Sequence, residues 1–316
     1  MKSLENTMNK STLVLGTVQL GMPYGLNNSH GQPTKEEAFS ILDTALAKGI
    51  DTFDTAYAYG TAEDVLGEWV RERSLASNVR IISKMRPHAL NDYSDGTKAS
   101  DVVRTELAKS LKRLGVDSLD GYLFHSPHYI YLSHMVAGMQ KAKDAGLMKN
   151  IGVSVYDEEE ALQAAELGVD YVQVPYNAFD QRLDATDFFD IAEKNNVAVF
   201  ARGPFLQGLL LMRPNELPTH LLYLRPHLER FIAIATHNGL TQAEAALRFV
   251  RSACRAGNIV FGVDTLAQLT EDINITNKQT VNKSNLAAEI KEAFGDLNRG
   301  AINPSLWSKI KQSRDS

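Results

Sequence analysis

The chain has 316 residues, of which 44% are hydrophobic, and its formal net charge is -5 at pH 7. This composition is sufficient for one large hydrophobic core. Cys254 is the only cysteine, which excludes an intramolecular disulfide, and we expect it to be a buried residue of a helix and not a nucleophile. There is no basic stripe for nucleic acid, no apolar run near the roughly 18 residues of a membrane span, and no apolar signal segment in residues 1–10, so we expect a cytoplasmic protein.

Short apolar runs alternate with amphipathic segments along the whole chain. We expect eight strands, at residues 13–16, 50–54, 79–83, 119–124, 150–155, 171–174, 197–200 and 259–261. Thr34 followed by Glu37 is a capping-box pattern that opens a helix stopped by Gly49. Further helices are predicted around residues 65–70 and at 100–114, 131–145, 158–167, 188–194, 221–237, 241–256 and from 266 onward.

Strands that are apolar on both faces and alternate with helices are typical of a parallel sheet covered by helices. The count of eight predicts an α/β fold of the (β/α)8 barrel type, as a single domain over residues 1–316. Residues 285–316 are expected to form a tail that covers the barrel mouth. Such barrels carry their chemistry on the loops after the strands.

Four chemically complementary residues stand at or just after the ends of three successive strands. Asp54 ends the second strand and is followed by Tyr59, Lys84 follows the third strand, and His125 follows the fourth. An ammonium next to a phenol favours the phenolate and strengthens Tyr59 as a proton donor, while Asp54 balances Lys84 and His125 orients a carbonyl oxygen. The set predicts a site that protonates an oxygen on which negative charge develops.

Each of these residues also has a simpler interpretation. Asp54 could cap the next helix, Lys84 could be a salt-bridged strand end, and His125 could be a loop histidine bonded to backbone. Their coincidence on consecutive loops favours chemistry. The other histidines, His128, His134, His227 and His237, show no metal-ligand spacing, so we expect no metal.

The segments Phe53–Gly60, Ser83-Lys84 and Phe124–Pro127 resemble the signature of the aldo-keto reductases. The resemblance extends from Leu15 to Asp272, and it implies a barrel that binds NADP(H) or NAD(H) without a Rossmann domain. The chain has no G-x-G-x-x-G motif, in agreement. It also implies a catalytic tetrad, with Tyr59 as the acid/base, made of Asp54, Tyr59, Lys84 and His125.

The same resemblance implies a set of cofactor-binding residues. Ser154 and Gln173 correspond to contacts of the nicotinamide amide, although Val155 stands where relatives have asparagine, and Tyr176 resembles an aromatic that stacks on the ring. Arg202 is expected to contact a phosphate. The complete predicted set is Gly16, Thr17, Ser154, Gln173, Tyr176, Arg202, Gly203, Phe205, Gly208, Gly262, Asp264, Thr265, Gln268 and Asp272.

The segment Gly262–Asp272 departs from the family pattern at one informative position. Many relatives have a basic residue near position 264 that holds the 2′-phosphate of NADP. Asp264 would repel that phosphate, whereas a carboxylate accepts hydrogen bonds from a free ribose hydroxyl. The cofactor is therefore NAD(P)H with a preference for NADH, unless Asp264 only caps the last helix and another cation, such as Lys278, holds the phosphate.

The expected substrate is a small carbonyl compound or alcohol, and the protein is expected to be a monomer or a weak homo-oligomer. Its substrate-binding residues are predicted to be aromatic or polar: Gln19, Met22, Tyr24, Tyr57, Tyr129, Phe205 and Trp307. Three alternatives remain open at this point. They are a sugar (aldose) dehydrogenase working oxidatively, a nucleotide-sensing regulatory subunit, and a barrel aldolase or isomerase with Lys84 as a Schiff-base lysine.

Overall fold

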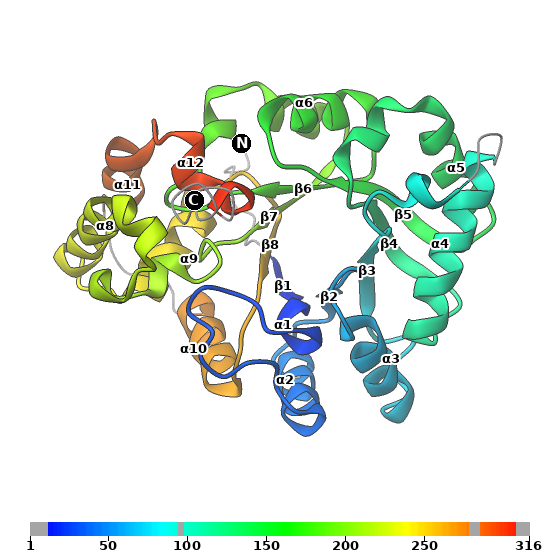
Figure 1. The fold of residues 1–316 in the computed structure, drawn as a ribbon, viewed down its shortest axis with the longest axis horizontal. Coiled ribbons are helices and arrows are strands. Elements are labelled where there is room, and N and C mark those ends of the chain that lie inside the picture. Colours follow the sequence, from blue (N-terminus) through cyan, green and yellow to red (C-terminus); the bar gives the residue numbers. More distant parts are fainter. Residues whose placement is uncertain (1–11, 94–97, 278–284, 308–316) are drawn as a thin grey trace, which may run out of the picture.

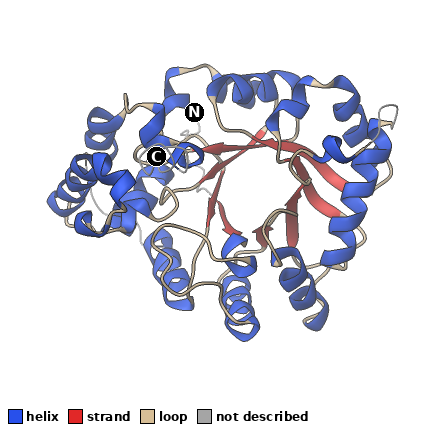
Figure 2. Cartoon of the chain, viewed as in Figure 1, coloured by secondary structure: helices blue, strands red, loops and turns tan. Residues whose placement is uncertain are grey.

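Eight parallel strands close into one barrel in chain order, with β8 paired back to β1. The computed structural model describes residues 12–93, 98–277 and 285–307. Figure 2 shows the strands as a central ring with helices outside it. The strands are β1 Thr12–Gly16, β2 Thr52–Asp54, β3 Arg80–Lys84, β4 Leu119–Phe124, β5 Met148–Ser154, β6 Tyr171–Pro175, β7 Ala198–Arg202 and β8 Asn258–Phe261. The predicted (β/α)8 barrel is confirmed.

Helices surround the barrel in the order that the sequence pattern predicts (Figure 1). They are α1 Val18–Gly21, α2 Lys35–Ala47, α3 Ala62–Glu72, α4 Ala99–Leu114, α5 Ser133–Asp144, α6 Glu158–Leu167, α7 Phe188–Lys194, α8 Arg225–His237, α9 Gln242–Ala253, α10 Leu266–Asn277, α11 Leu286–Phe294 and α12 Arg299–Ile302. Short 3-10 turns are η1 Ala89–Asp92, η2 Pro127–Tyr131, η3 Arg182–Ala185, η4 Leu209–Leu211, η5 Pro214–Glu216, η6 Thr219–Leu224 and η7 Pro304–Leu306.

Local chemistry sets several of these boundaries. The Thr34 side chain accepts from the Glu37 backbone N–H and Glu37 reaches back to the backbone of Thr34, which confirms the capping box that opens α2. Gly115 ends α4 in the left-handed region, with φ 65°. Asp54 does not cap α3, because Thr61 occupies the N-cap position of that helix.

Several boundaries differ from the sequence prediction, among them the start of α8, and one short helix was not predicted. Residues 221–237 were expected to form one helix, but residues 219–224 form the turn η6 and α8 starts at Arg225, where Pro226 suits a first helical turn. The short helix α1 was not predicted, because four residues are too few to show helical periodicity.

The core has two layers, as the alternation of side chains along each strand requires. Val14, Ile82, Leu123, Phe200 and Val260 fill the barrel interior. The neighbouring outward positions, such as Leu15 and Phe261, join the larger cluster between strands and helices. Among the residues described, no helix has the length and apolarity needed to cross a membrane.

Among the last described elements, α11 packs against α8 and α9 at one side of the barrel (Figure 1), and α12 follows it in the chain. From this segment, Ile302 and Asn303 to Ser305 reach the wall of the central cavity. That the whole tail covers the barrel mouth stays a prediction, and residues 308–316 lie outside the described part.

Candidate active site

Lys84 links the predicted catalytic residues at the floor of the barrel mouth. Its Nζ donates to Asp54 Oδ2 at 2.6 Å, to Tyr59 Oη at 3.3 Å and to the backbone oxygen of Thr55 at 3.0 Å. Lys84 is 1% exposed and Asp54 3% exposed. The ends of β2 and β3 are adjacent in the sheet, which brings the carboxylate and the ammonium together without any long loop.

His125, directly after β4, completes the group. Its ring lies edge-on to the ring of Tyr59, with centroids 5.8 Å apart and planes at 89°. Its Nδ1 is buried and has no hydrogen-bond partner. Burial, together with the charges of Lys84 and Arg202, lowers the pKa of His125 to about 3, so the imidazole is neutral at physiological pH.

Burial is also the main influence on the pKa values of Tyr59 and Lys84. Desolvation of the phenolate raises the pKa of Tyr59 far above its usual value, the carboxylate of Asp54 raises it further, and Arg202 lowers it. Burial lowers the pKa of Lys84, while Asp54 opposes that shift. The loss of water around Tyr59 therefore has a larger effect on its pKa than the neighbouring ammonium of Lys84, the only group that the sequence indicated.

Gln173 connects the tetrad to β5 and β6. Its Nε2 donates to Asp54 Oδ1, and its Oε1 is buried without a partner. Gln173 is paired in register with Ser154, which faces the cavity. An unpaired buried acceptor beside a hydroxyl suits a carboxamide, which offers N–H donors and an oxygen acceptor, so this pair fits the amide of a nicotinamide.

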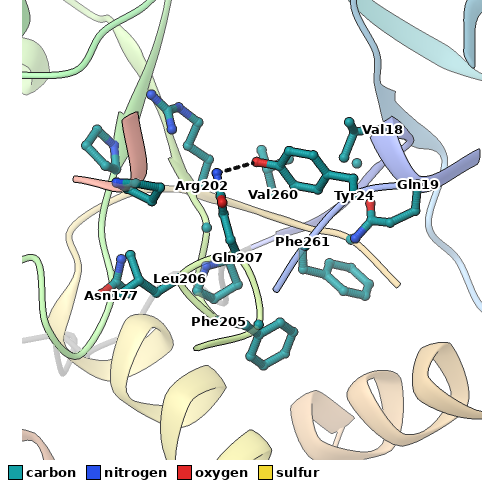
Figure 3. A pocket seen from close by; sticks show the side chains of 18 of the residues that line it. Val18, Gln19, Tyr24, Asn177, Arg202, Phe205, Leu206, Gln207, Val260 and Phe261 are labelled. Atoms are coloured by element: carbon teal, nitrogen blue, oxygen red, sulfur yellow. Dashed lines mark hydrogen bonds between the residues drawn. The ribbon is translucent and has the colours of Figure 1, made fainter. Parts of the chain in front are cut away.

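One cavity of about 450 Å³ extends from the tetrad to the end of β8. It is lined by most of the residues that the sequence predicted, namely Gly16, Gln19, Tyr24, Asp54, Tyr59, His125, Ser154, Arg202, Gly203, Phe205, Gly208, Gly262, Asp264, Gln268 and Asp272. Figure 3 shows residues of the loops after β1 and β7 and of the strand β8 converging on this space. Tyr24 Oη accepts a hydrogen bond from Gln207 Nε2 across it at 3.0 Å (Figure 3).

The β8 end of the cavity is acidic. Asp264, Glu271 and Asp272 line it, and none of the described lysines or arginines lines that end. Asn28 Nδ2 donates to Asp264 Oδ1 at 3.1 Å, and the Asp264 backbone N–H donates to Gln268 Oε1 at 2.6 Å. Burial, reinforced by Glu271, raises the pKa of Asp272 to about 8. Lys278, the alternative cation, lies outside the described residues.

Four predicted substrate residues, Met22, Tyr57, Tyr129 and Trp307, are not among the residues that line this cavity. The ring of Tyr57 lies under the guanidinium of Arg113, 3.9 Å from its carbon. Tyr129 is 1% exposed, packs edge-on against Phe124, and its Oη accepts from the Leu90 backbone N–H. Trp307 is 3% exposed and donates to the Gly300 oxygen, while its neighbours 302–305 line the cavity instead.

Four predicted cofactor residues, Thr17, Gln173, Tyr176 and Thr265, are also not among the lining residues. Tyr176 is fully buried, stacks on Phe249 with centroids 5.8 Å apart, and donates to Asp184, so its ring has no free face toward the cavity. The side chain of Thr17 is buried and donates to the Asp54 backbone oxygen. Thr265 accepts from the Gln268 backbone N–H.

Sequence reasoning missed several lining residues, including Asn28, Asn177, Arg182, Gln207 and Glu271. Gln207 and Arg182 follow β7 and β6, so the rule that barrel loops carry function could have found them. Asn28 lies 236 positions from its partner Asp264, and no local pattern indicates that contact.

The sequence model of the Aldo/keto reductase family matches residues 12–292. The chain belongs to this family. Similar proteins include the uncharacterized oxidoreductase YqkF of Bacillus subtilis (strain 168), which is 22% identical over 80% of this chain and 87% of its own length. D-threo-aldose 1-dehydrogenase of Pseudomonas sp is 25% identical over 82% of this chain and 88% of its own.

Among solved structures, the fold is similar to that of an aldo-keto reductase from Bacillus halodurans (holo form), with a TM-score of 0.72 and 19% identity over 92% of this chain and 95% of that one. Family membership indicates NAD(P)-dependent oxidoreduction of carbonyl compounds. The substrate class of the family is small molecules.

Proposed function

We propose that this chain interconverts an aldehyde or ketone with its alcohol, using NAD(P)H, with Tyr59 as the proton donor in reduction. The observation that carries the proposal is the position of Lys84 Nζ, which bridges Asp54 and Tyr59 Oη at the floor of a cavity large enough for substrate. The reduced nicotinamide, when bound, supplies the hydride that no side chain can supply.

The protein residues handle the proton and the charge. As the carbonyl oxygen gains negative charge, the Tyr59 hydroxyl transfers its proton to that oxygen, and the Lys84 ammonium stabilises the phenolate left behind. Asp54 keeps Lys84 in place and charged. Neutral His125 contacts the same phenol and would orient the oxygen through a ring N–H. Oxidation runs the same transfers in reverse.

The cofactor is proposed to lie along the cavity between β5 and β8. Ser154 and Gln173 would hold the amide of the nicotinamide, and the open backbone at Gly203, where no atom lies within 4 Å of an added Cβ, leaves room for close approach. The remaining contacts are assigned to cavity-lining residues that the sequence predicted, namely Gly16, Phe205, Gly208, Gly262, Asp264, Gln268 and Asp272. Thr17 and Thr265 would act indirectly, by bonding to Asp54 and Gln268.

NADH is the proposed preferred cofactor. The carboxylates of Asp264 and Glu271 at the β8 end would repel a 2′-phosphate, whereas Asp264 can accept a hydrogen bond from a ribose hydroxyl.

The first experiment titrates NADH and NADPH by fluorescence against the wild type, Asp264→Arg and Asp264→Asn. We expect the wild type to bind NADH about 10-fold more tightly than NADPH, which corresponds to about 1.4 kcal/mol. Asp264→Arg should reverse the order, and Asp264→Asn, which removes the charge without adding a cation, should abolish it. Tighter NADPH binding in the wild type would contradict the preference, and no binding of either nucleotide would contradict the proposed function.

The role of Tyr59 is tested by Tyr59→Phe. This variant should keep the wild-type affinity for NADH and lose turnover, because it keeps the ring next to His125 but lacks the proton. Turnover equal to wild type would remove the acid/base assignment. A wild type that binds nucleotide but turns over no carbonyl compound would instead favour a nucleotide-sensing role.

Oxidation of an aldose is a second candidate. The similarity to a D-threo-aldose 1-dehydrogenase extends over most of this chain, and a preference for NAD would suit oxidation. Comparing NAD-dependent oxidation of aldoses with NADH-dependent reduction of aldehydes distinguishes the two directions.

A further inference from the structure

The cavity contains two arginines, and their surroundings are opposite. Arg182 is neutralised, since it lies 2.8 Å from Glu158 and 2.9 Å from Asp180. Arg202, at the end of β7, makes no ion pair with any carboxylate in the described part of the chain. Partial burial of an arginine without a counter-ion costs desolvation free energy, and an anionic ligand would offset that cost.

The guanidinium of Arg202 is fixed at the tetrad end of the cavity. Its Nη2 donates to the Val155 backbone oxygen at 2.8 Å, and its plane lies over the ring of Tyr156 at 4.8 Å from the centroid. Its Nε is buried and has no hydrogen-bond partner. Val155 directly follows Ser154 at the end of β5, so the guanidinium is held above β5. The side chain itself starts from β7 and lies across the cavity from Tyr24 (Figure 3).

The other charges at this end cancel. Lys84 and Asp54 form a closed ion pair, and His125 is neutral. Arg202 therefore leaves a net positive charge beside the reacting groups, and its field reaches Tyr59, Lys84 and His125. At the opposite, β8 end the lining includes the carboxylates of Asp264 and Glu271, and the second lining arginine, Arg182, is ion-paired, so among the described lining residues the unpaired arginine is the one beside the reacting groups.

We propose that Arg202 binds a carboxylate or phosphate group of the carbonyl substrate, so that the substrate is an anionic aldehyde or ketone. The guanidinium fork matches the two oxygens of such a group, and Arg202 lines the cavity with only its Nη2 hydrogen bond to the Val155 oxygen made by the described part of the chain. This inference rests on the proposed function, and it names the substrate class for that site.

The same oxyanion chemistry has a second source, the diphosphate of the cofactor, for which the sequence predicted Arg202. The contacts with Val155 and Tyr156 favour the substrate, because they hold the guanidinium at the end of β5 and not over the loop between β7 and β8. The two sources predict different measurements.

The test compares two aldehydes of equal chain length, 4-oxobutanoate and uncharged butanal, with NADH in the wild type, Arg202→Gln and Arg202→Lys. We expect the wild type to favour 4-oxobutanoate in kcat/KM, and Arg202→Gln to reduce that preference about 10- to 100-fold. Arg202→Lys, which keeps a charge but not the fork, should fall between them. Thermal unfolding of both variants checks that the fold is retained, and Arg182→Gln is the matched control, expected to affect both aldehydes alike.

The dissociation constant of NADH, measured by fluorescence without substrate, separates the two sources. Unchanged NADH affinity in Arg202→Gln with loss of the charged-substrate preference supports the inference. Weaker NADH binding with an equal loss for both aldehydes would overturn it in favour of the diphosphate. A wild type that binds NADH but shows no preference for the anionic aldehyde would also overturn it, whereas failure of the wild type to bind either nucleotide would overturn the proposed function itself.

Discussion

Gly21 offers a direct test of how the position of Tyr59 controls turnover. A Cβ atom on Gly21 would lie 2.0 Å from the Tyr59 backbone oxygen and 2.3 Å from the Ala62 backbone nitrogen. Real Cβ contacts are essentially never below 3.0 Å, and both neighbours are backbone atoms that no rotamer change can move. The helix α1 and the loop that carries Tyr59 must therefore separate by about 1 Å, the difference between the required and the available distance.

The displacement acts on the weakest contact of the tetrad. Lys84 Nζ is already 3.3 Å from Tyr59 Oη, so a further shift of about 1 Å takes the pair beyond hydrogen-bonding distance. Misplacement on this scale costs on the order of 100-fold in rate. Overpacking at the contact should also lower the free energy of unfolding by about 1–3 kcal/mol.

The assay measures kcat, the dissociation constant of NADH and the free energy of unfolding for Gly21→Ala and for Gly257→Ala. Gly257 is the matched control, because an added Cβ meets no atom within 4 Å there. We expect Gly21→Ala to lose about 100-fold in kcat with little change in NADH affinity, and Gly257→Ala to resemble the wild type. Wild-type kcat and stability in Gly21→Ala would refute the reasoning, since the loop would then absorb the methyl group without moving Tyr59.

Two further predictions concern buried charges. Lys84→Met leaves Asp54 buried without its cation and should lower the free energy of unfolding, measured in denaturant titrations, by about 3–5 kcal/mol. The double variant Lys84→Met/Asp54→Asn should recover part of that stability but no turnover. If the stability losses of the two single variants simply add in the double variant, the two residues do not stabilise each other. Asp272 has a pKa of about 8 in the folded protein, above its ordinary value of 3.8, so the folded state binds the extra proton and stability should fall as pH rises from about 4 to about 8. Asp272→Asn should remove this dependence, whose slope is at most about 1.4 kcal/mol per pH unit; the same slope in both proteins would show that Asp272 is not responsible.

The sequence by itself was sufficient to predict the barrel and the group of four residues at its mouth. The reason is that both depend on short-range order. Each strand is a local apolar run, parallel neighbours follow one another along the chain, and a residue at the end of a strand is placed by that strand alone. Asp54 and Lys84 meet because β2 and β3 are adjacent, and the capping box of Thr34 and Glu37 is visible within four residues.

Only the tertiary structure decided which aromatic rings face the cavity. Tyr24 and Tyr57 look alike in the sequence, yet Tyr24 bonds to Gln207 across the cavity and Tyr57 lies under Arg113. The ring of Tyr176 stacks on the ring of Phe249, which belongs to α9 and lies more than seventy positions later in the chain. The direction of a side chain in a loop depends on partners from distant elements, and a single sequence carries no local mark of them.

Charge balance was decided in the same way. The sequence shows that Arg182 and Arg202 each stand at or after the end of a strand. It does not show that Asp180 and Glu158 neutralise Arg182, whereas Arg202 contacts only the Val155 backbone oxygen and the ring of Tyr156. Likewise, the pKa of Tyr59 and of Asp272 depends on how much water the surrounding chain excludes. Desolvation is a property of the packed molecule, because every element that covers a group contributes to it.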